Sequence, residues 1–243
     1  MTNFSLDPGR SQRKKMIPFL LQGHTRPLTK VKYNKQGDIL VSASKDNNPN
    51  IWWSDNGERI GTLNGHTGSI WSIDVASDSR RVITGSADNS AKIWDMETGK
   101  CLNTLTFETA VRSVNYSLGD RQVCLITDAT MGKQSTLLVF DVANPTEPVM
   151  KVLASEESAK KATVCAWTDC NESIITAHNN GALKLWDPKT GTVSLAKSEG
   201  QAHSDTIRDL QFSAEMSFFI TASKDQSAKI FDSASLDCIK TFK

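Results

Sequence analysis

The sequence has no apolar run of the roughly 20 residues that a membrane-spanning helix needs. Near the N-terminus, Phe4 and Leu6 stand among polar residues, so the apolar segment of a secretory signal is missing as well. The five cysteines are an odd number and include no C-x-x-C pair, which argues against a disulfide framework. We therefore expect a protein of a reducing compartment, cytoplasmic or nuclear, with no membrane contact.

Motifs that would indicate catalysis or cofactor binding are also missing. There is no Gly-x-Gly-x-x-Gly or Walker A pattern for a nucleotide, and no Gly-x-Ser-x-Gly elbow for a nucleophilic serine. Cys165, Cys170 and His178 come closest to a metal set, but zinc needs tighter pairs and four ligands. We expect no catalytic residue, no metal, no cofactor and no small-molecule substrate.

Charge is nearly balanced, at a net +1, so no overall field draws the chain to nucleic acid. Residues 1–15 are the exception, because four basic residues and one acid give them a net +3. We predict that 1–15 is a disordered, solvated extension. The alternative is that this basic tail touches RNA or another subunit.

The main positive signal is an internal repeat. In three segments a histidine precedes an aspartate by 22 residues, and the aspartate precedes an aromatic residue by 6. The three sets are His24, Asp46 and Trp52; His66, Asp88 and Trp94; and His203, Asp225 and Phe231. Two degenerate copies close at Phe140 and Trp186, so successive closing aromatics are 42, 46, 46 and 45 residues apart.

This period and the short alternating segments between turn residues predict an all-β propeller built from four-stranded blades. Five blades are expected, at approximately 24–63, 66–105, 108–153, 158–197 and 203–242, within a propeller domain that covers 16–243.

The recurring polar residues resemble the structural tetrad of WD40 proteins, in which Trp, Ser or Thr, His and Asp form a buried hydrogen-bond chain. The sets would be His24, Ser44, Asp46 and Trp52, then His66, Ser86, Asp88 and Trp94. Such a chain satisfies a buried indole N–H, which would otherwise cost about 1–3 kcal/mol. A serine, histidine and aspartate could also suggest a hydrolase triad, but recurrence at constant spacing favours architecture.

The last copy keeps His203, Ser223 and Asp225 but has Phe231 in place of the tryptophan. Since phenylalanine has no N–H to donate, its chain must stop at the hydroxyl. We predict that this blade is less constrained than the second.

From Met16 onward the chain resembles the family of the WD40 subunit i of eukaryotic translation initiation factor 3. The segments that carry the resemblance are Leu21-Gln22-Gly23-His24, Asn56-Gly57-Glu58-Arg59, Thr84-Gly85-Ser86-Ala87-Asp88-Asn89-Ser90 and Thr221-Ala222-Ser223-Lys224-Asp225. The resemblance implies a seven-bladed, non-catalytic scaffold in the cytoplasm that binds subunits b and g on the small ribosomal subunit. It also implies contact with a helix of subunit b through Asp209 and Asp225. Independently of the family, Trp53 is the better of the two adjacent tryptophans for an exposed partner contact.

Only five of the seven blades that the resemblance implies are present, so we expect an open ring and a truncated form or partial gene model of a longer protein. Residues 19–22 would be an orphan strand that belongs to the last blade. Alternatively, they displace residues 238–242 and close a five-bladed ring.

Three other functions stay open at this point. The chain could be a WD40 adaptor of a receptor-associated or ubiquitin-ligase complex. It could be an enzyme, although no nucleophile and base stand outside the repeated positions, or an RNA-binding protein whose affinity falls steeply with salt.

Overall fold

A computed structural model describes residues 18–130, 132–154, 161–197 and 201–243. The predicted N-terminal extension, 1–15, and the first residues assigned to the fourth blade, 158–160, lie outside these ranges. Within them, the one helical segment is the 3-10 turn η1, Asp169–Asn171, and no helix is long and apolar enough to cross a membrane.

The strands form five four-stranded sheets, and in each sheet the strands lie in chain order with antiparallel neighbours. Blade 1 contains β1 (Leu28–Tyr33), β2 (Ile39–Ser44), β3 (Asn50–Trp53) and β4 (Arg59–Thr62). Blade 2 contains β5 (Ile70–Val75), β6 (Arg81–Ser86), β7 (Ser90–Asp95) and β8 (Cys101–Thr106). Blade 3 contains β9 (Val111–Tyr116), β10 (Gln122–Thr127), β11 (Thr136–Asp141) and β12 (Pro148–Leu153). Blade 4 contains β13 (Ala162–Trp167), β14 (Ile174–His178), β15 (Leu183–Trp186) and β16 (Val193–Lys197). Blade 5 contains β17 (Ile207–Phe212), β18 (Phe218–Ser223), β19 (Ala228–Asp232) and β20 (Cys238–Phe242).

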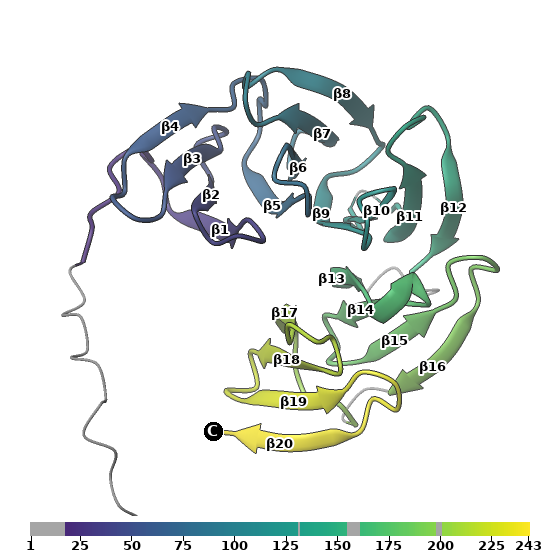
Figure 1. The fold of residues 1–243 in the computed structure, drawn as a ribbon. Coiled ribbons are helices and arrows are strands. Elements are labelled where there is room, and N and C mark those ends of the chain that lie inside the picture. Colours follow the sequence, from purple (N-terminus) through teal and green to yellow (C-terminus); the bar gives the residue numbers. More distant parts are fainter. Residues whose placement is uncertain (1–17, 131, 155–160, 198–200) are drawn as a thin grey trace, which may run out of the picture.

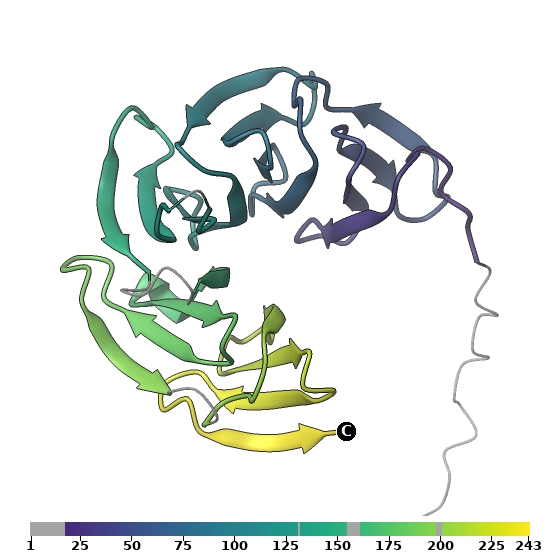
Figure 2. The same cartoon turned by 180° about the vertical axis from the view of Figure 1, so that it is seen from behind.

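The blades follow one another around a common centre, with the first strand of each blade innermost and the last on the rim (Figure 1). The arc stays open between blade 1 and blade 5, and the view from behind shows the same opening (Figure 2). The predicted all-β propeller with five four-stranded blades and an open ring is therefore confirmed.

The apolar core is divided among the contacts between blades. Four clusters of buried side chains each combine residues of two neighbouring blades, and large members of these clusters include Ile73, Leu125, Trp167 and Phe219. Alternation along the strands explains this, because each central strand presents side chains to both faces of its sheet and therefore to both neighbours.

Side-chain hydrogen bonds join the inner strands of successive blades. Thr29 Oγ1 donates to the carbonyl of Ile70 at 2.6 Å, and Thr163 Oγ1 donates to the carbonyl of Ile207 at 2.7 Å. Ser72 Oγ accepts the N–H of Val114, and Ser113 Oγ accepts the N–H of Cys165. These bonds satisfy polar groups where the blades converge and fix neighbouring blades at one angle.

Residues 19–22 differ from the prediction. They form no strand but irregular backbone, and a Cβ on Gly57 would lie 2.8 Å from Leu21 Cδ2. The segment therefore lies against the β3–β4 turn of blade 1. The outer position of blade 5 is held by β20, which pairs with β19, so the alternative in which 19–22 displaces residues 238–242 is wrong.

Candidate functional site

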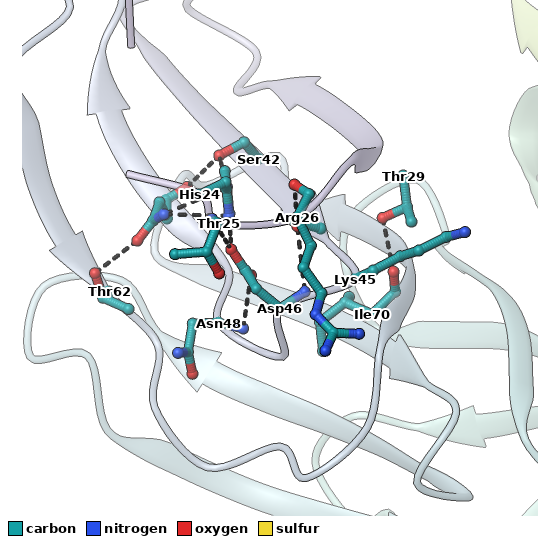
Figure 3. Close-up of polar contacts among 12 residues, drawn as sticks. His24, Thr25, Arg26, Thr29, Ser42, Lys45, Asp46, Asn48, Thr62 and Ile70 are labelled. Carbon is teal, nitrogen blue, oxygen red and sulfur yellow. Dashed lines mark hydrogen bonds and ion pairs between the residues drawn. The ribbon is translucent and has the colours of Figure 1, made fainter. Parts of the chain in front are cut away.

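In three blades the recurring histidine, from the loop before the first strand, pairs with the recurring aspartate, from the turn between the second and third strands. In blade 1, His24 Nδ1 lies 2.9 Å from Asp46 Oδ2 and His24 Nε2 lies 2.7 Å from Ser42 Oγ, so the imidazole bridges a loop and a strand (Figure 3). Trp52 Nε1 donates to the same Ser42 Oγ at 2.8 Å. Asp46 also accepts the N–H of Thr25, which ties down the loop that follows the histidine.

Blade 2 repeats this arrangement with a threonine. Trp94 Nε1 donates to Thr84 Oγ1 at 2.9 Å, Thr84 Oγ1 lies 2.7 Å from His66 Nε2, and His66 Nδ1 lies 2.7 Å from Asp88 Oδ2. An indole can only donate and a carboxylate can only accept, which sets the two ends of the chain. Because burial lowers the pKa of His66, its Nε2 is an acceptor, and it lies closer to the Thr84 hydroxyl than the Lys92 carbonyl does, at 2.7 against 3.3 Å. Thr84 accepts from Trp94 and donates to Nε2, and the neutral His66 donates from Nδ1 to Asp88.

The electrostatics agree with a neutral histidine beside an ionised aspartate. Burial lowers the pKa of His66 and outweighs the opposite effect of Asp88. Burial alone would raise the pKa of Asp88, but hydrogen bonds from Ser90, His66 and the Thr67 N–H outweigh it and lower that pKa to about 2.

The hydroxyl of each chain is not the serine that the sequence analysis assigned. Ser44, Ser86 and Ser223 lie two residues further along the strand, where each accepts the N–H of the following aspartate and donates to a loop carbonyl. Their assignment as the link between tryptophan and histidine is wrong. Residues 42 and 44 share one face of their strand, but Trp52 pairs with Leu40 and Trp94 pairs with Val82, so the hydroxyls nearest to the indoles, one diagonal step away, are those of residues 42 and 84. These serines tighten the turn that presents the aspartate.

In blade 5 the chain ends at a threonine. His203 Nε2 lies 2.7 Å from Thr221 Oγ1 and His203 Nδ1 lies 2.8 Å from Asp225 Oδ2. Phe231 supplies no N–H and instead stacks on Phe219, with ring centroids 5.4 Å apart. The polar network of this blade therefore has one link fewer than in blades 1 and 2.

Blade 4 satisfies its tryptophan in a way that sequence reasoning missed. Trp186 Nε1 donates to Thr176 Oγ1 at 2.8 Å, and Thr176 lies 3.0 Å from Nε2 of His178, which belongs to the same strand rather than to a loop. Burial, with a smaller effect of Lys184, lowers the pKa of His178 to about 3. A spacing signal was available, because Ser42, Thr84, Thr176 and Thr221 all precede the closing aromatic by 10 residues.

Blade 3 has no such chain among its described residues and instead buries an acid between two cations. Asp128 lies 3.7 Å from Arg112 Nε and 3.2 Å from Lys161 Nζ. The second of these ion pairs links blade 3 to blade 4. A buried carboxylate with two cations needs both of them to offset its desolvation.

These arrangements are poorly suited to catalysis. Thr84 is fully buried, and its hydroxyl is already bonded to both an indole and an imidazole. A nucleophile must reach a substrate, and this oxygen contacts only the protein interior. Among the described residues, no group of three or more His, Cys, Asp or Glu side chains is placed to hold a metal ion.

The three residues predicted to contact partners lie in different settings. Asp209, on β17, has a half-exposed carboxylate 3.8 Å from Lys30 Nζ of β1. The side chain of Asp225 is only 8% exposed and is held by His203. Trp53, at the end of β3, is 41% exposed, whereas the adjacent Trp52 is buried in its chain. Asp209 and Trp53 are therefore accessible, and Asp225 is not.

Comparison with known proteins gives a consistent result. The model of the EIF3I family matches residues 16–243. The chain is 43% identical over 234 residues to "Eukaryotic translation initiation factor 3 subunit I" of Drosophila melanogaster, a match that covers 94% of this chain and 70% of the relative. Its counterparts in Drosophila erecta and Culex quinquefasciatus are 42% and 41% identical over the same length and coverage. These relatives are named as subunits of a translation initiation factor, not as enzymes.

Proposed function

Because the chain belongs to the EIF3I family, we propose that it acts as a non-catalytic scaffold subunit of eukaryotic translation initiation factor 3. The observation that carries this proposal is the family match, which spans all five blades. The position of the recurring polar residues inside the protein supports this proposal. They are taken up by hydrogen-bond chains that connect the loop, the turn and the strands within one blade, which leaves the blade surfaces for binding other proteins.

The proposed partners are subunits b and g of the same factor, with the small ribosomal subunit reached through the assembled complex. Such a role places the protein in the cytoplasm. A propeller is suited to a scaffold function, because its rigid sheets present several separate surfaces that are already formed before a partner binds.

Asp209 is the proposed contact with a helix of subunit b. Its carboxylate is half exposed and has one cation, Lys30, nearby, so a basic side chain of the partner can share it. The resemblance to the family implies the same contact for Asp225. Because its carboxylate is bonded to His203, we expect its substitution to act through the fold of blade 5 rather than through the partner.

A pull-down tests this proposal. The tagged full chain should retain subunits b and g from a eukaryotic extract, and the helical tail of subunit b should bind it directly. Asp209→Asn should weaken binding of that tail. Asp55→Asn is the matched control, since Asp55 is an exposed acid on the β3–β4 turn of blade 1 and should leave binding unchanged.

One outcome would contradict the scaffold proposal, and another would contradict only the role of Asp209. Recovery of receptor-associated or ubiquitin-ligase components in place of the initiation factor subunits would identify a different kind of WD40 adaptor. Equal binding by the Asp209 and Asp55 variants would remove Asp209 from the interface while leaving the scaffold role in place.

A further inference from the structure

All five inner strands share one irregularity. In each, the second residue is skipped in the pairing with the next strand, which is a β-bulge. The skipped residues are Thr29, Trp71, Arg112, Thr163 and Arg208. A bulge turns a side chain away from the regular alternation of its strand. All five residues line one cavity of about 790 Å³ at one mouth of the central channel, and we refer to this cavity as the channel mouth.

The channel mouth is strongly basic, although the chain as a whole is not. Lys30, Lys45, Arg112 and Arg208 line it, and Asp209 is the one acid among its lining residues. The resulting net charge of +3 compares with +1 for the whole sequence. A recess with low-dielectric walls concentrates the field of such charges and raises the local concentration of an oppositely charged ligand.

Arg112 is held in place but not fully satisfied. Its guanidinium lies over the ring of Trp71, 4.3 Å from the centroid, and Asp128 approaches its Nε only to 3.7 Å. Nε itself is buried and has no hydrogen-bond partner. Nε is out of a ligand's reach, but 29% of the Arg112 side chain is exposed, so a carboxylate can approach the rest of the guanidinium from the recess.

We propose that the channel mouth binds an acidic peptide segment, whose carboxylates pair with Arg112, Arg208 and Lys45. This inference rests on the proposed scaffold function and deepens it by naming the chemistry of a second partner. The helix of subunit b would pair with Asp209, and the acidic segment would pair with the cations around it. Planar guanidinium groups match carboxylates geometrically, and both Lys45, from blade 1, and Arg208, from blade 5, are exposed at the recess.

A peptide fits these observations better than RNA does. The cations gather in a recess surrounded by five strands, whereas single-stranded nucleic acid needs an extended basic groove. Arg112 covers one face of Trp71, the aromatic ring among the lining residues, so no open stacking platform is provided. Asp209 would also oppose a continuous row of phosphates, while a peptide can space its carboxylates around it.

The test uses the full chain and a fluorescein-labelled peptide of ten residues in which glutamate alternates with serine, so that its carboxylates are spaced. Fluorescence anisotropy at low salt should detect binding by the unaltered protein. The double variant K45E/R208E should bind at least about tenfold more weakly, since it replaces two charge-assisted pairs by two repulsions. Both residues are exposed, and circular dichroism checks that the fold is retained.

The control is K100E/K189E, which changes the net charge by the same amount on exposed turns of blades 2 and 4. It should bind the peptide like the unaltered protein. Equal loss in the two double variants would reduce the effect to overall charge and overturn the proposal. It would also be overturned if a ten-nucleotide RNA bound more tightly than the peptide. In either case, continued co-purification with initiation factor subunits would show that the scaffold function itself stands.

Discussion

Replacing Thr84 by valine removes a single hydroxyl at the centre of the blade 2 chain. Valine has nearly the same shape as threonine and an equally good preference for strands, so the backbone should be unaffected. The change leaves two buried groups without a partner, Nε1 of Trp94 and Nε2 of His66. Each such group costs about 1–3 kcal/mol, so we expect a loss of roughly 2–6 kcal/mol in the free energy of unfolding.

The other blades supply matched comparisons. Thr221→Val strands only Nε2 of His203, because Phe231 has no N–H, and should therefore cost about half as much. Ser86→Ala removes two longer bonds, of 3.1 and 3.2 Å, and should cost about 1 kcal/mol.

Urea unfolding followed by far-ultraviolet circular dichroism gives these free energies by linear extrapolation. A double-mutant cycle adds a direct measure of the bond. In T84V/W94F the stranded indole is gone, so the combined cost should fall short of the sum of the single costs by about 1–3 kcal/mol. If Thr84→Val costs no more than Ser86→Ala, the chain does not run through Thr84 and the reasoning fails.

Three further outcomes follow from the structure. Since the pKa of Asp88 is lowered from 3.8 to about 2, its stabilising effect is complete above about pH 4 and is lost as the pH falls toward 2. Asp88→Asn should flatten the stability curve in that window, and an unchanged acid limb would refute the assignment. Hydrogen exchange should be faster in Ala228–Asp232 than in Ala91–Asp95, because blade 5 lacks the indole link. Gly181 and Gly37 both have φ +79°, but a Cβ on Gly181 would collide with the backbone of the loop before blade 5, whereas Gly37 has nothing within 4 Å. Both alanine variants incur the left-handed cost of about 1–2 kcal/mol, so Gly181→Ala should be clearly the more destabilising, and equal melting temperatures would contradict this contact.

Much of the fold could be predicted because the repeated residues contact one another in each blade, and this contact requires a constant spacing. His66 and Asp88 must meet across a fixed length of hairpin, and the constant spacing of 22 residues reflects that geometry. The same reasoning gave the number of blades and their order.

The hydroxyl was misassigned because two serines or threonines occur close together on each second strand. Ser44 lies at the turn and accepts the N–H of Asp46, whereas Ser42 lies on the same face but one diagonal step from Trp52, where it accepts the indole N–H. Counting 10 residues back from the closing aromatic would have identified it, and would have found Thr176 in the degenerate fourth blade as well. His178 stands where the other blades have the turn serine, so a histidine from the strand replaced the expected one from a loop.

The basic channel mouth could not be predicted at all. Trp71, Arg112 and Arg208 are far apart in the sequence, and the five bulge positions hold threonine, tryptophan or arginine, so no single residue type marks them. They come together through a backbone irregularity of the pairing, which leaves no compositional signal.

Each apolar cluster among the described residues lies between two neighbouring blades, and this arrangement determines the order in which the blades unfold. Blades 2, 3 and 4 each contribute to two of the clusters found among the described residues, while blades 1 and 5 each contribute to one. A terminal blade can therefore detach at the expense of a single interface, but a middle blade cannot leave without exposing both of its neighbours. Loss of structure should accordingly proceed inward from the two ends, and blade 3 should be the last part of the molecule to become accessible to a protease.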